Sequence, residues 1–280
     1  MLPDAPPARP LRTAVVQSAA RPLDIAANAR EAAARCERAA AGGARLVVLS
    51  ELHLTAYDVQ GLADAPDSAV LSADDARSVL DDRLAPLAAA TARHRLTVLV
   101  GAPVRHPDGR LTNSLLAVTP DGAVTVAYDK RHLWQDTEAA LFTPGAPGPA
   151  LLTVDGWRIG PGVCYDMSFP EHARAAALAG AHAVVYASAF AAGSEYRAAV
   201  YCRARALENT VYTVFANPLD GPLDRPCAGS SAVHAPDGTT LAEAAPGEDT
   251  VLVADLTPGR LADVRRHLRM LAELRTSAPA

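Results

Sequence analysis

Residues 157–190 read WRIGPGVCYDMSFPEHARAAALAGAHAVVYASAF, which divides into an apolar run, an alanine-rich polar run and a second apolar run. The first ten residues predict a strand, residues 169–180 a helix that ends at a glycine, and residues 182–190 another strand. The alternation continues with a predicted helix over residues 194–209 and a strand over residues 210–217. Strands and helices that alternate in this way are typical of an α/β layered fold with largely buried sheets.

The N-terminal half of the chain follows the same pattern. Residues 1–10 hold four prolines and are expected to form a disordered arm, so that a single domain spans residues 11–280. An acidic stretch at residues 58–83 predicts a loop or lid, or a loop followed by a helix. The other elements expected here are a strand from Leu11, a helix over 23–41, a strand over 44–52, a helix over 83–94, a strand over 97–103 and two strands that flank the Pro-Asp-Gly turn at 120–122.

The overall composition excludes several classes of function. The formal net charge is −5 and no basic stripe offers a surface for phosphates, so nucleic acid is not an expected partner. No segment approaches the roughly 18 apolar residues of a membrane helix, and we expect a cytoplasmic protein without membrane contact. The four cysteines, Cys36, Cys164, Cys202 and Cys227, are too widely spaced for a zinc motif and do not support a disulfide framework.

Three polar residues directly follow apolar runs of strand length. Glu51 comes after LVVLS, Lys130 after VTVAYD, and Cys164 after IGPGV. In α/β sheets the strand ends are where ligands and catalytic groups collect. Burying a carboxylate, an ammonium and a thiol is costly unless the groups compensate one another, so we expect the three side chains to lie together.

Cys164 also stands just before a predicted helix. Ser168 is expected to be the N-cap of that helix, with Pro170 near its first position and Glu171 closing a capping box. A helix N-terminus and a nearby lysine both favour a thiolate, so the sequence predicts a lowered pKa for the Cys164 thiol. These residues alone leave a catalytic and a merely structural role for the thiol equally open.

Four segments resemble, in order, the signature segments of the nitrilase-type carbon–nitrogen hydrolase superfamily. They are LSELHLTAYD at 49–58, AYDKRHLW at 127–134, EAALFTPG at 138–145 and GPGVCYDMSFPEHAR at 160–174. The likeness extends over about residues 11–275 and implies a four-layer αββα sandwich with two packed β-sheets. It also implies a homodimer or a higher homo-oligomer.

The resemblance assigns a role to each strand-end residue. Glu51 corresponds to the general base, Lys130 to the cation that stabilises the tetrahedral intermediate, and Cys164 to the nucleophile. The backbone N–H of Tyr165 corresponds to a second donor to the oxyanion. Glu138 corresponds to a further carboxylate, which either transfers protons or holds Lys130 as an ion-pair partner.

The chemistry that the resemblance implies is hydrolysis of a small-molecule amide through a cysteine thioester, without a metal or an organic cofactor. An acyltransferase that uses the same thioester, and a binding protein with a vestigial site, are the alternatives. His53 and His132 lie beside the expected base and lysine in the sequence, and we expect them to pack against the site and not to act as the base.

Aromatic residues near strand ends are candidates for the substrate pocket, namely Tyr57, Trp134 and Phe190. CYD followed by FPE is similar to the amidase branches of the superfamily, in particular to omega-amidases. Ser168 stands where those enzymes usually carry arginine, which argues against a substrate that bears a carboxylate. Residues 193–197, GSEYR, replace a common histidine-tryptophan pair and predict an atypical pocket.

Overall fold

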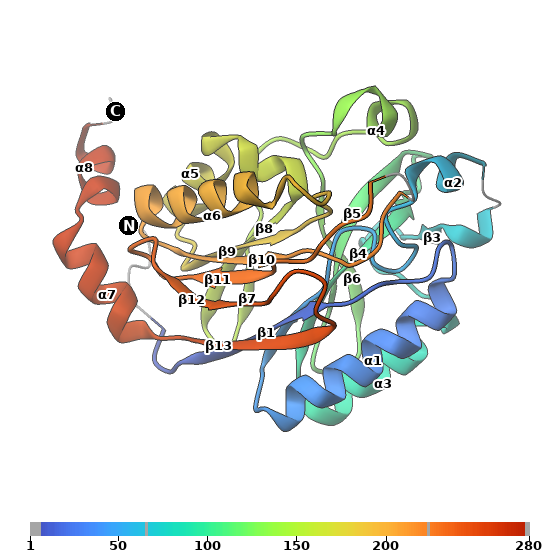
Figure 1. Ribbon diagram of the computed structural model, residues 1–280, viewed down its shortest axis with the longest axis horizontal. Coiled ribbons are helices and arrows are strands. Elements are labelled where there is room, and N and C mark those ends of the chain that lie inside the picture. Colours follow the sequence, from blue (N-terminus) through green and yellow to red (C-terminus); the bar gives the residue numbers. More distant parts are fainter. Residues whose placement is uncertain (1–6, 65–66, 223–224, 278–280) are drawn as a thin grey trace.

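The structure, a computed structural model, describes residues 7–64, 67–222 and 225–277, which form two packed β-sheets with helices outside. Figure 1 shows four layers: helices α1 (Ile25–Ala41) and α3 (Ala85–His94), the two sheets, and helices α5 (Pro170–Leu178) and α6 (Glu195–Asn209). The α/β fold class and the four-layer αββα sandwich that we predicted are confirmed.

The first sheet has the strand order β13–β1–β2–β4–β5–β6, and the short strand β3 pairs with β4. Its centre, β1–β2–β4, is parallel, because α1 and α3 carry the chain back between successive strands. The later strands β4, β5 and β6 form an antiparallel meander. The strands of this sheet are β1 (Leu11–Gln17), β2 (Leu46–Val48), β3 (Leu71–Ser72), β4 (Thr97–Arg105), β5 (Leu111–Val118), β6 (Val124–Asp129) and β13 (Thr250–Leu256).

The second sheet has the strand order β12–β11–β10–β9–β8–β7. Strands β8, β9 and β10 are parallel, and helices α5 and α6 connect them in turn. This confirms the strand–helix alternation predicted from residues 157–217. The strands of this sheet are β7 (Leu152–Val154), β8 (Trp157–Val163), β9 (Ala183–Ala187), β10 (Tyr212–Ala216), β11 (Ala232–His234) and β12 (Thr240–Glu243).

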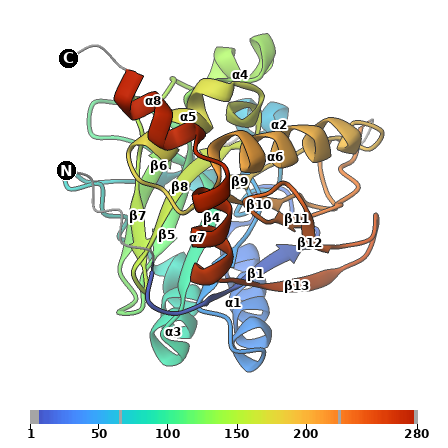
Figure 2. The same cartoon turned by 90° about the vertical axis from the view of Figure 1, so that its left-hand side faces the viewer.

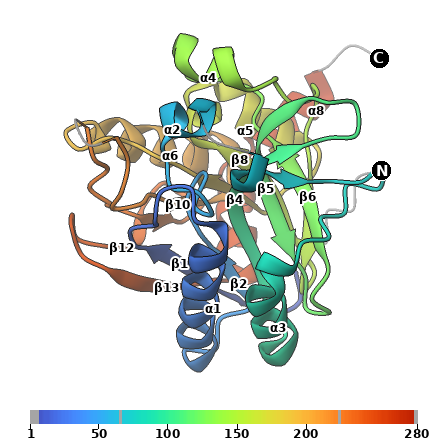
Figure 3. The ribbon, with the colours of Figure 1, turned by 90° about the vertical axis from the view of Figure 1, so that its right-hand side faces the viewer.

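The remaining helices lie at the ends of the sandwich. Figure 3 shows α2 (Val59–Asp64) and α4 (Gln135–Leu141) together at the end opposite the exposed tips of α1 and α3. Figure 2 shows α7 (Pro258–His267) and α8 (Met270–Ser277) in succession at the other side of the molecule. No helix among the described residues is long and apolar enough to cross a membrane.

Three apolar layers hold the sandwich together. The layer between the sheets combines residues of both, such as Val15 and Leu99 from the first with Ile159 and Val185 from the second, all fully buried. A second layer lies under α1 and α3, and a third lies under α5 and α6. Because β-strands with both faces covered bury nearly every side chain, the central strands read as continuous apolar runs in the sequence.

The acidic stretch at residues 58–83 has more structure than the sequence predicted. Apart from residues 65–66, which lie outside the described part, it forms α2, two 3₁₀ turns and strand β3. Its apolar residues Val59, Leu62, Ala69 and Leu71 are buried, so tertiary packing orders a segment whose own periodicity is weak.

Part of the expected N-terminal arm, residues 1–6, lies outside the described residues. Immediately after it, the carbonyl of Arg9 accepts a hydrogen bond of 2.9 Å from the indole of the fully buried Trp157. The chain is therefore anchored to the second sheet before Leu11, where we expected the fold to begin.

We predict that Gly101→Ala in β4 destabilises the protein by about 2–3 kcal/mol, as overpacking does in a rigid core. A Cβ at this position would lie 2.7 Å from the carbonyl carbon of Glu51, so the backbone that carries this carboxylate would have to move. The free energy of unfolding in urea measures the effect.

Gly259→Ala in α7 is the matched control, because a Cβ there meets no atom within 4 Å. This variant should be neutral or slightly stabilising, since alanine has the higher helix propensity. Equal stability of the two variants would contradict the close approach of β4 to Glu51.

Candidate active site

The three strand-end residues meet where strands of the two sheets end together. Lys130 and Cys164 directly follow β6 and β8, and Glu51 follows β2 by three residues. The backbone N–H of Glu51 donates to the carbonyl of Ser188, just past β9, at 3.3 Å, which joins the ends of the two sheets. The predicted convergence of these residues is therefore present in the structure.

Lys130 is fully buried between two carboxylates. Its Nζ donates to Glu51 Oε1 at 2.7 Å and lies 2.8 and 2.7 Å from the two carboxylate oxygens of Glu138. Burial by itself lowers the pKa of a lysine, but the charges of Glu51 and Glu138 outweigh it and raise the pKa of Lys130 above its ordinary value. Lys130 is therefore a permanent cation at the centre of the site.

Glu51 has one bonded and one unbonded carboxylate oxygen. Oε1 accepts from Lys130 and from the Asn113 side chain, each at 2.7 Å, whereas Oε2 is buried and has no hydrogen-bond partner among the described residues. Burial raises the pKa of Glu51 to about 7, although the charge of Lys130 opposes the shift. A carboxylate with a free oxygen and a pKa near neutrality can accept and return a proton.

Glu138, by contrast, has both carboxylate oxygens occupied. Besides Lys130, Oε1 accepts from the Tyr57 hydroxyl and Oε2 from the backbone N–H of Trp134, both at 2.7 Å. Trp134 immediately precedes α4, so this carboxylate also caps the first turn of its own helix. The geometry favours Glu138 as the ion-pair partner that holds Lys130, which is one of the two roles left open by the sequence.

Cys164 occupies a sharp turn between β8 and a 3₁₀ turn at Cys164–Ser168. Its φ of 41° lies in the left-handed region, which side chains other than glycine rarely adopt and which often marks functional sites. The turn directs the thiol into a cavity, so that Cys164 is partly exposed.

The predicted lowering of the thiol pKa is wrong. Burial and the charge of Glu51 raise the pKa of Cys164 well above its ordinary value, and the opposing effects of Lys130 and of the Ala189 backbone N–H are smaller. Ser168 is not the N-cap of α5 either, because it belongs to the 3₁₀ turn. The residue before α5 is Phe169, which has no side chain that could cap the helix.

The sequence analysis missed Asp166, the buried carboxylate that bonds to both sides of the turn at Cys164. Its Oδ2 accepts from the Val163 backbone N–H at 3.0 Å and from the Tyr128 hydroxyl at 2.9 Å. Its Oδ1 accepts from the backbone N–H of His132 at 3.0 Å and lies 2.7 Å from His132 Nδ1. Burial alone would raise the pKa of Asp166, but the bonds from His132 and the Val163 N–H, together with nearby positive charge that includes Lys130, hold it below its ordinary value. Asp166 therefore ties the Cys164 turn to the segment that follows Lys130.

Arg205 on α6 supports the other end of the same turn. It pairs with Glu208 at 3.0 Å, and it also donates to the carbonyls of Met167 and Ser168 at 3.0 and 3.2 Å. Arg205 therefore satisfies two carbonyls at the end of the turn that begins at Cys164.

The two histidines near the site have other contacts. The ring of His132 stacks on Phe169 with centroids 3.8 Å apart, in addition to its bond with Asp166. His53 is buried beside the Ser50 hydroxyl at 3.1 Å, and burial lowers its pKa to about 4. Within the described chain neither ring forms a hydrogen bond with Cys164.

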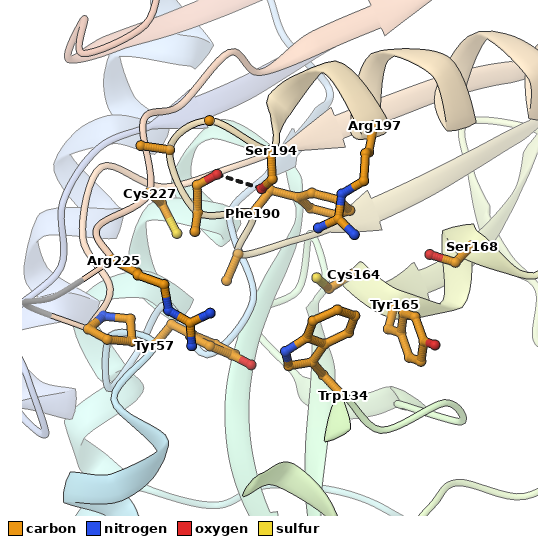
Figure 4. A pocket seen from close by; sticks show the side chains of 15 residues that line it. Tyr57, Trp134, Cys164, Tyr165, Ser168, Phe190, Ser194, Arg197, Arg225 and Cys227 are labelled. Carbon is orange, nitrogen blue, oxygen red and sulfur yellow. Dashed lines mark hydrogen bonds between the residues drawn. The ribbon is translucent and has the colours of Figure 1, made fainter. Parts of the chain in front are cut away.

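A cavity of about 260 Å³ opens above Cys164 (Figure 4). The four residues proposed from the sequence for the pocket, Tyr57, Trp134, Tyr165 and Phe190, all line it. The rings of Trp134 and Tyr165 meet edge to face with centroids 4.9 Å apart. Ser168 and three residues of the GSEYR segment, Gly193, Ser194 and Arg197, also line the cavity, as do residues that the sequence analysis did not select, namely Ala189, Ala191, Ala192, Pro222, Arg225 and Cys227.

Comparisons with known proteins agree with this arrangement. A family model described as carbon-nitrogen hydrolase matches residues 12–266. The chain is 35% identical over 245 residues to a protein of Pseudomonas protegens named "Hydrolase in pqqF 5'region", covering 87% of this chain and 81% of that protein. It is 31% identical over 257 residues to the deaminated glutathione amidase of Escherichia coli O157:H7, covering 90% and 93% of the two chains.

Solved structures of an amidase from Nesterenkonia sp. AN1 are also similar. A cysteine-to-alanine variant of that amidase in complex with butyramide has a TM-score of 0.77 and 28% identity, covering 96% of this chain and 97% of that chain. In a second variant, with a TM-score of 0.77 and 29% identity over 92% of this chain and 98% of that chain, acrylamide has added to the active-site cysteine.

We predict that Asp166→Asn destabilises the protein by about 2–3 kcal/mol, since it removes the charge of a buried acceptor of four bonds. Asparagine has an NH₂ group in place of one carboxylate oxygen. In either orientation of the amide, this NH₂ group would face an N–H or O–H donor that now bonds to Asp166. Urea unfolding measures the loss. Asp263→Asn, whose partner Arg266 is largely exposed, should cost less than about 0.5 kcal/mol, and equal losses would contradict the role of Asp166.

Proposed function

The chain belongs to the carbon–nitrogen hydrolase family, and on this basis we propose that it hydrolyses the amide bond of a small molecule with Cys164 as nucleophile. The observation that carries the proposal is the unbonded, buried oxygen of Glu51 beside the Lys130 cation and the Cys164 thiol. The amidases among the similar proteins support the same reaction class.

In the first half of the proposed reaction, Glu51 accepts the thiol proton while Cys164 Sγ attacks the amide carbon. A base is needed because the raised pKa of Cys164 keeps the resting sulfur protonated. The negative charge that develops on the substrate oxygen faces the ammonium of Lys130 and the backbone N–H of Tyr165. Glu51 then returns its proton to the nitrogen, the carbon–nitrogen bond breaks, and a thioester and ammonia or an amine result.

In the second half, water attacks the thioester as Glu51 takes one of its protons. The second tetrahedral intermediate has the same charge as the first, so Lys130 and Tyr165 stabilise it in the same way. When this intermediate collapses, the carbon–sulfur bond breaks, the proton passes from Glu51 to the sulfur, and the carboxylic acid leaves. The free enzyme is thereby restored.

Within this proposal Glu138 positions Lys130. A lysine side chain has many rotamers, and bonds to two carboxylates confine its ammonium to one place. Because the bonds from Tyr57 and the Trp134 backbone occupy Glu138 as well, the cation is held by a network that reaches the wall of the cavity. The cytoplasmic location and the homo-oligomeric state stay predictions from the sequence.

We predict that Cys164→Ala lowers turnover of butyramide by on the order of 10⁴-fold or more, since no other group in the proposed reaction forms the thioester. Ammonia release measures turnover, and mass spectrometry of the wild type should show an acyl adduct on the peptide that contains Cys164. Cys36→Ala, on the buried face of α1, is the control and should retain turnover. Full activity of the Cys164 variant would contradict the proposal.

The pH dependence should report the ionisation of Glu51. Its carboxylate must be unprotonated to accept the thiol proton, and its pKa is raised to about 7. We therefore expect kcat/KM for butyramide to be low in acid, to rise about tenfold per pH unit below neutrality, and to level off above about pH 7. A profile that stays flat down to pH 5 would show that Glu51 is not the base.

A further inference from the structure

The side chain of Asn217, the residue directly after β10, holds the backbone of Phe190. Its Oδ1 accepts from the Phe190 N–H at 2.7 Å, and its Nδ2 donates to the Phe190 carbonyl at 3.1 Å. A third bond connects Nδ2 to the carbonyl of Gly229 at 2.8 Å. Asn217 is fully buried, so these bonds do not compete with bonds to water. The amide therefore fixes both backbone polar groups of a residue in the cavity wall.

The segment held in this way, residues 188–190, contacts both the proposed base and the proposed nucleophile. The carbonyl of Ser188 accepts from the backbone N–H of Glu51 at 3.3 Å. The backbone N–H of Ala189 is a hydrogen-bond donor to the Cys164 sulfur, which opposes the rise of the thiol pKa. Glu51 follows a strand of the first sheet and Cys164 a strand of the second. The position of this segment therefore sets the position of the base relative to the sulfur.

Asn217 is itself held by a chain of bonds that reaches the first sheet. Its backbone N–H donates to the Ser231 hydroxyl at 3.0 Å, and the hydroxyl donates to the Asn217 carbonyl at 3.1 Å. The N–H of Ser231 donates to Oε1 of Gln17, the last residue of β1, at 2.8 Å. Asn217, Ser231 and Gln17 are all fully buried. A buried polar network of this kind fixes one arrangement of its members, and here it ends at the segment beside Cys164.

We propose that Asn217 is a positioning residue for the reaction, which holds residues 188–190 so that the Ala189 N–H stabilises the Cys164 sulfur when it gains negative charge. This rests on the proposed function and adds a donor to it. Negative charge develops on the sulfur as Glu51 withdraws the thiol proton, and again as the carbon–sulfur bond of the second tetrahedral intermediate breaks and the electron pair passes to the sulfur. A donor that is already in place stabilises both states without reorganisation.

The chain offers a matched control for the burial and the bonds of Asn217. Asn28 on α1 is also buried, and its amide accepts from the N–H of Arg21 and donates to the carbonyl of the same residue, both at 2.8 Å. Its other bond is donated to the carbonyl of Leu54 at 3.0 Å. Asn28 is not among the described residues that line the cavity. Alanine at either position removes three side-chain bonds, but only Asn217→Ala releases the segment beside Cys164.

The first measurement is ammonia release from butyramide, at a temperature at which circular dichroism shows both variants to be folded. Asn217→Ala should lower kcat by about 10- to 100-fold, because the misplaced donor acts on charge that develops during the reaction. Asn28→Ala should keep kcat within about threefold of the wild type, although the two variants should lose similar amounts of the urea midpoint. If Asn217→Ala does not fold, Asn217→Ser and Asn28→Ser, whose hydroxyls can keep one bond, take the place of the alanine variants.

The second measurement does not require amide hydrolysis. Iodoacetamide reacts with the thiolate of a cysteine, forming a carbon–sulfur bond as iodide leaves, and mass spectrometry follows the peptide that contains Cys164. At about pH 8 the rate should fall about tenfold in Asn217→Ala, because the sulfur loses the N–H donor that opposes its raised pKa. Glu51, Lys130 and Glu138, whose charges also act on this sulfur, are the same in all of the proteins compared. The rate in Asn28→Ala should match that of the wild type.

The two measurements separate the possible outcomes. If Asn217→Ala resembles Asn28→Ala in both kcat and alkylation rate, Asn217 has a structural role alone, and the inference is wrong while the proposed function stands. A loss of kcat without a change in the alkylation rate would also overturn the inference, since the effect would then not act through the sulfur. If the wild type releases no ammonia from butyramide, the proposed function is contradicted, and the alkylation rates still decide whether Asn217 controls the reactivity of Cys164.

Discussion

A lysine ammonium held between two carboxylates, with all three side chains withdrawn from water, is the constraint on which the rest of the structure depends. Removing such ions from water costs several kcal/mol each, so every one of them requires the others. The fold satisfies this requirement because β2 and β6 run in the same direction in the first sheet and end at the same edge, where α4 supplies Glu138. Glu51, Lys130 and Glu138 then meet at distances of 2.7–2.8 Å.

The two carboxylates are chemically different because their other contacts differ. Glu138 accepts bonds on both oxygens, whereas Glu51 keeps one oxygen without a partner. Burial raises the pKa of Glu51 to about 7 and raises the pKa of Cys164 well above its ordinary value, so the resting thiol is protonated beside a carboxylate that titrates near neutrality. The strained turn at Cys164 persists because Asp166 and Arg205 bond its two ends to neighbouring elements.

Much of the fold and the principal site residues could be predicted from local sequence. Buried parallel strands need uninterrupted apolar runs, and the polar residues that end such runs at Glu51, Lys130 and Cys164 stand out against them. The Ser168 cap was predicted wrongly, because the N–H and C=O groups of that turn bond to side chains distant in sequence. Asp166 lies within the recognised segment, but its importance depends on Tyr128 and His132, which only the fold brings to it.

The sequence by itself determined the order of strands and helices, the family resemblance and the choice of Cys164 as the candidate nucleophile, because each depends on short-range pattern. Only the tertiary structure decided the direction of the Cys164 pKa shift, the different hydrogen bonding of Glu51 and Glu138, and the set of residues that line the cavity. These properties arise from burial and from contacts between residues far apart in the chain, as with Tyr57 and Arg197, which line the same cavity. A linear pattern does not contain the distances that set such electrostatic effects.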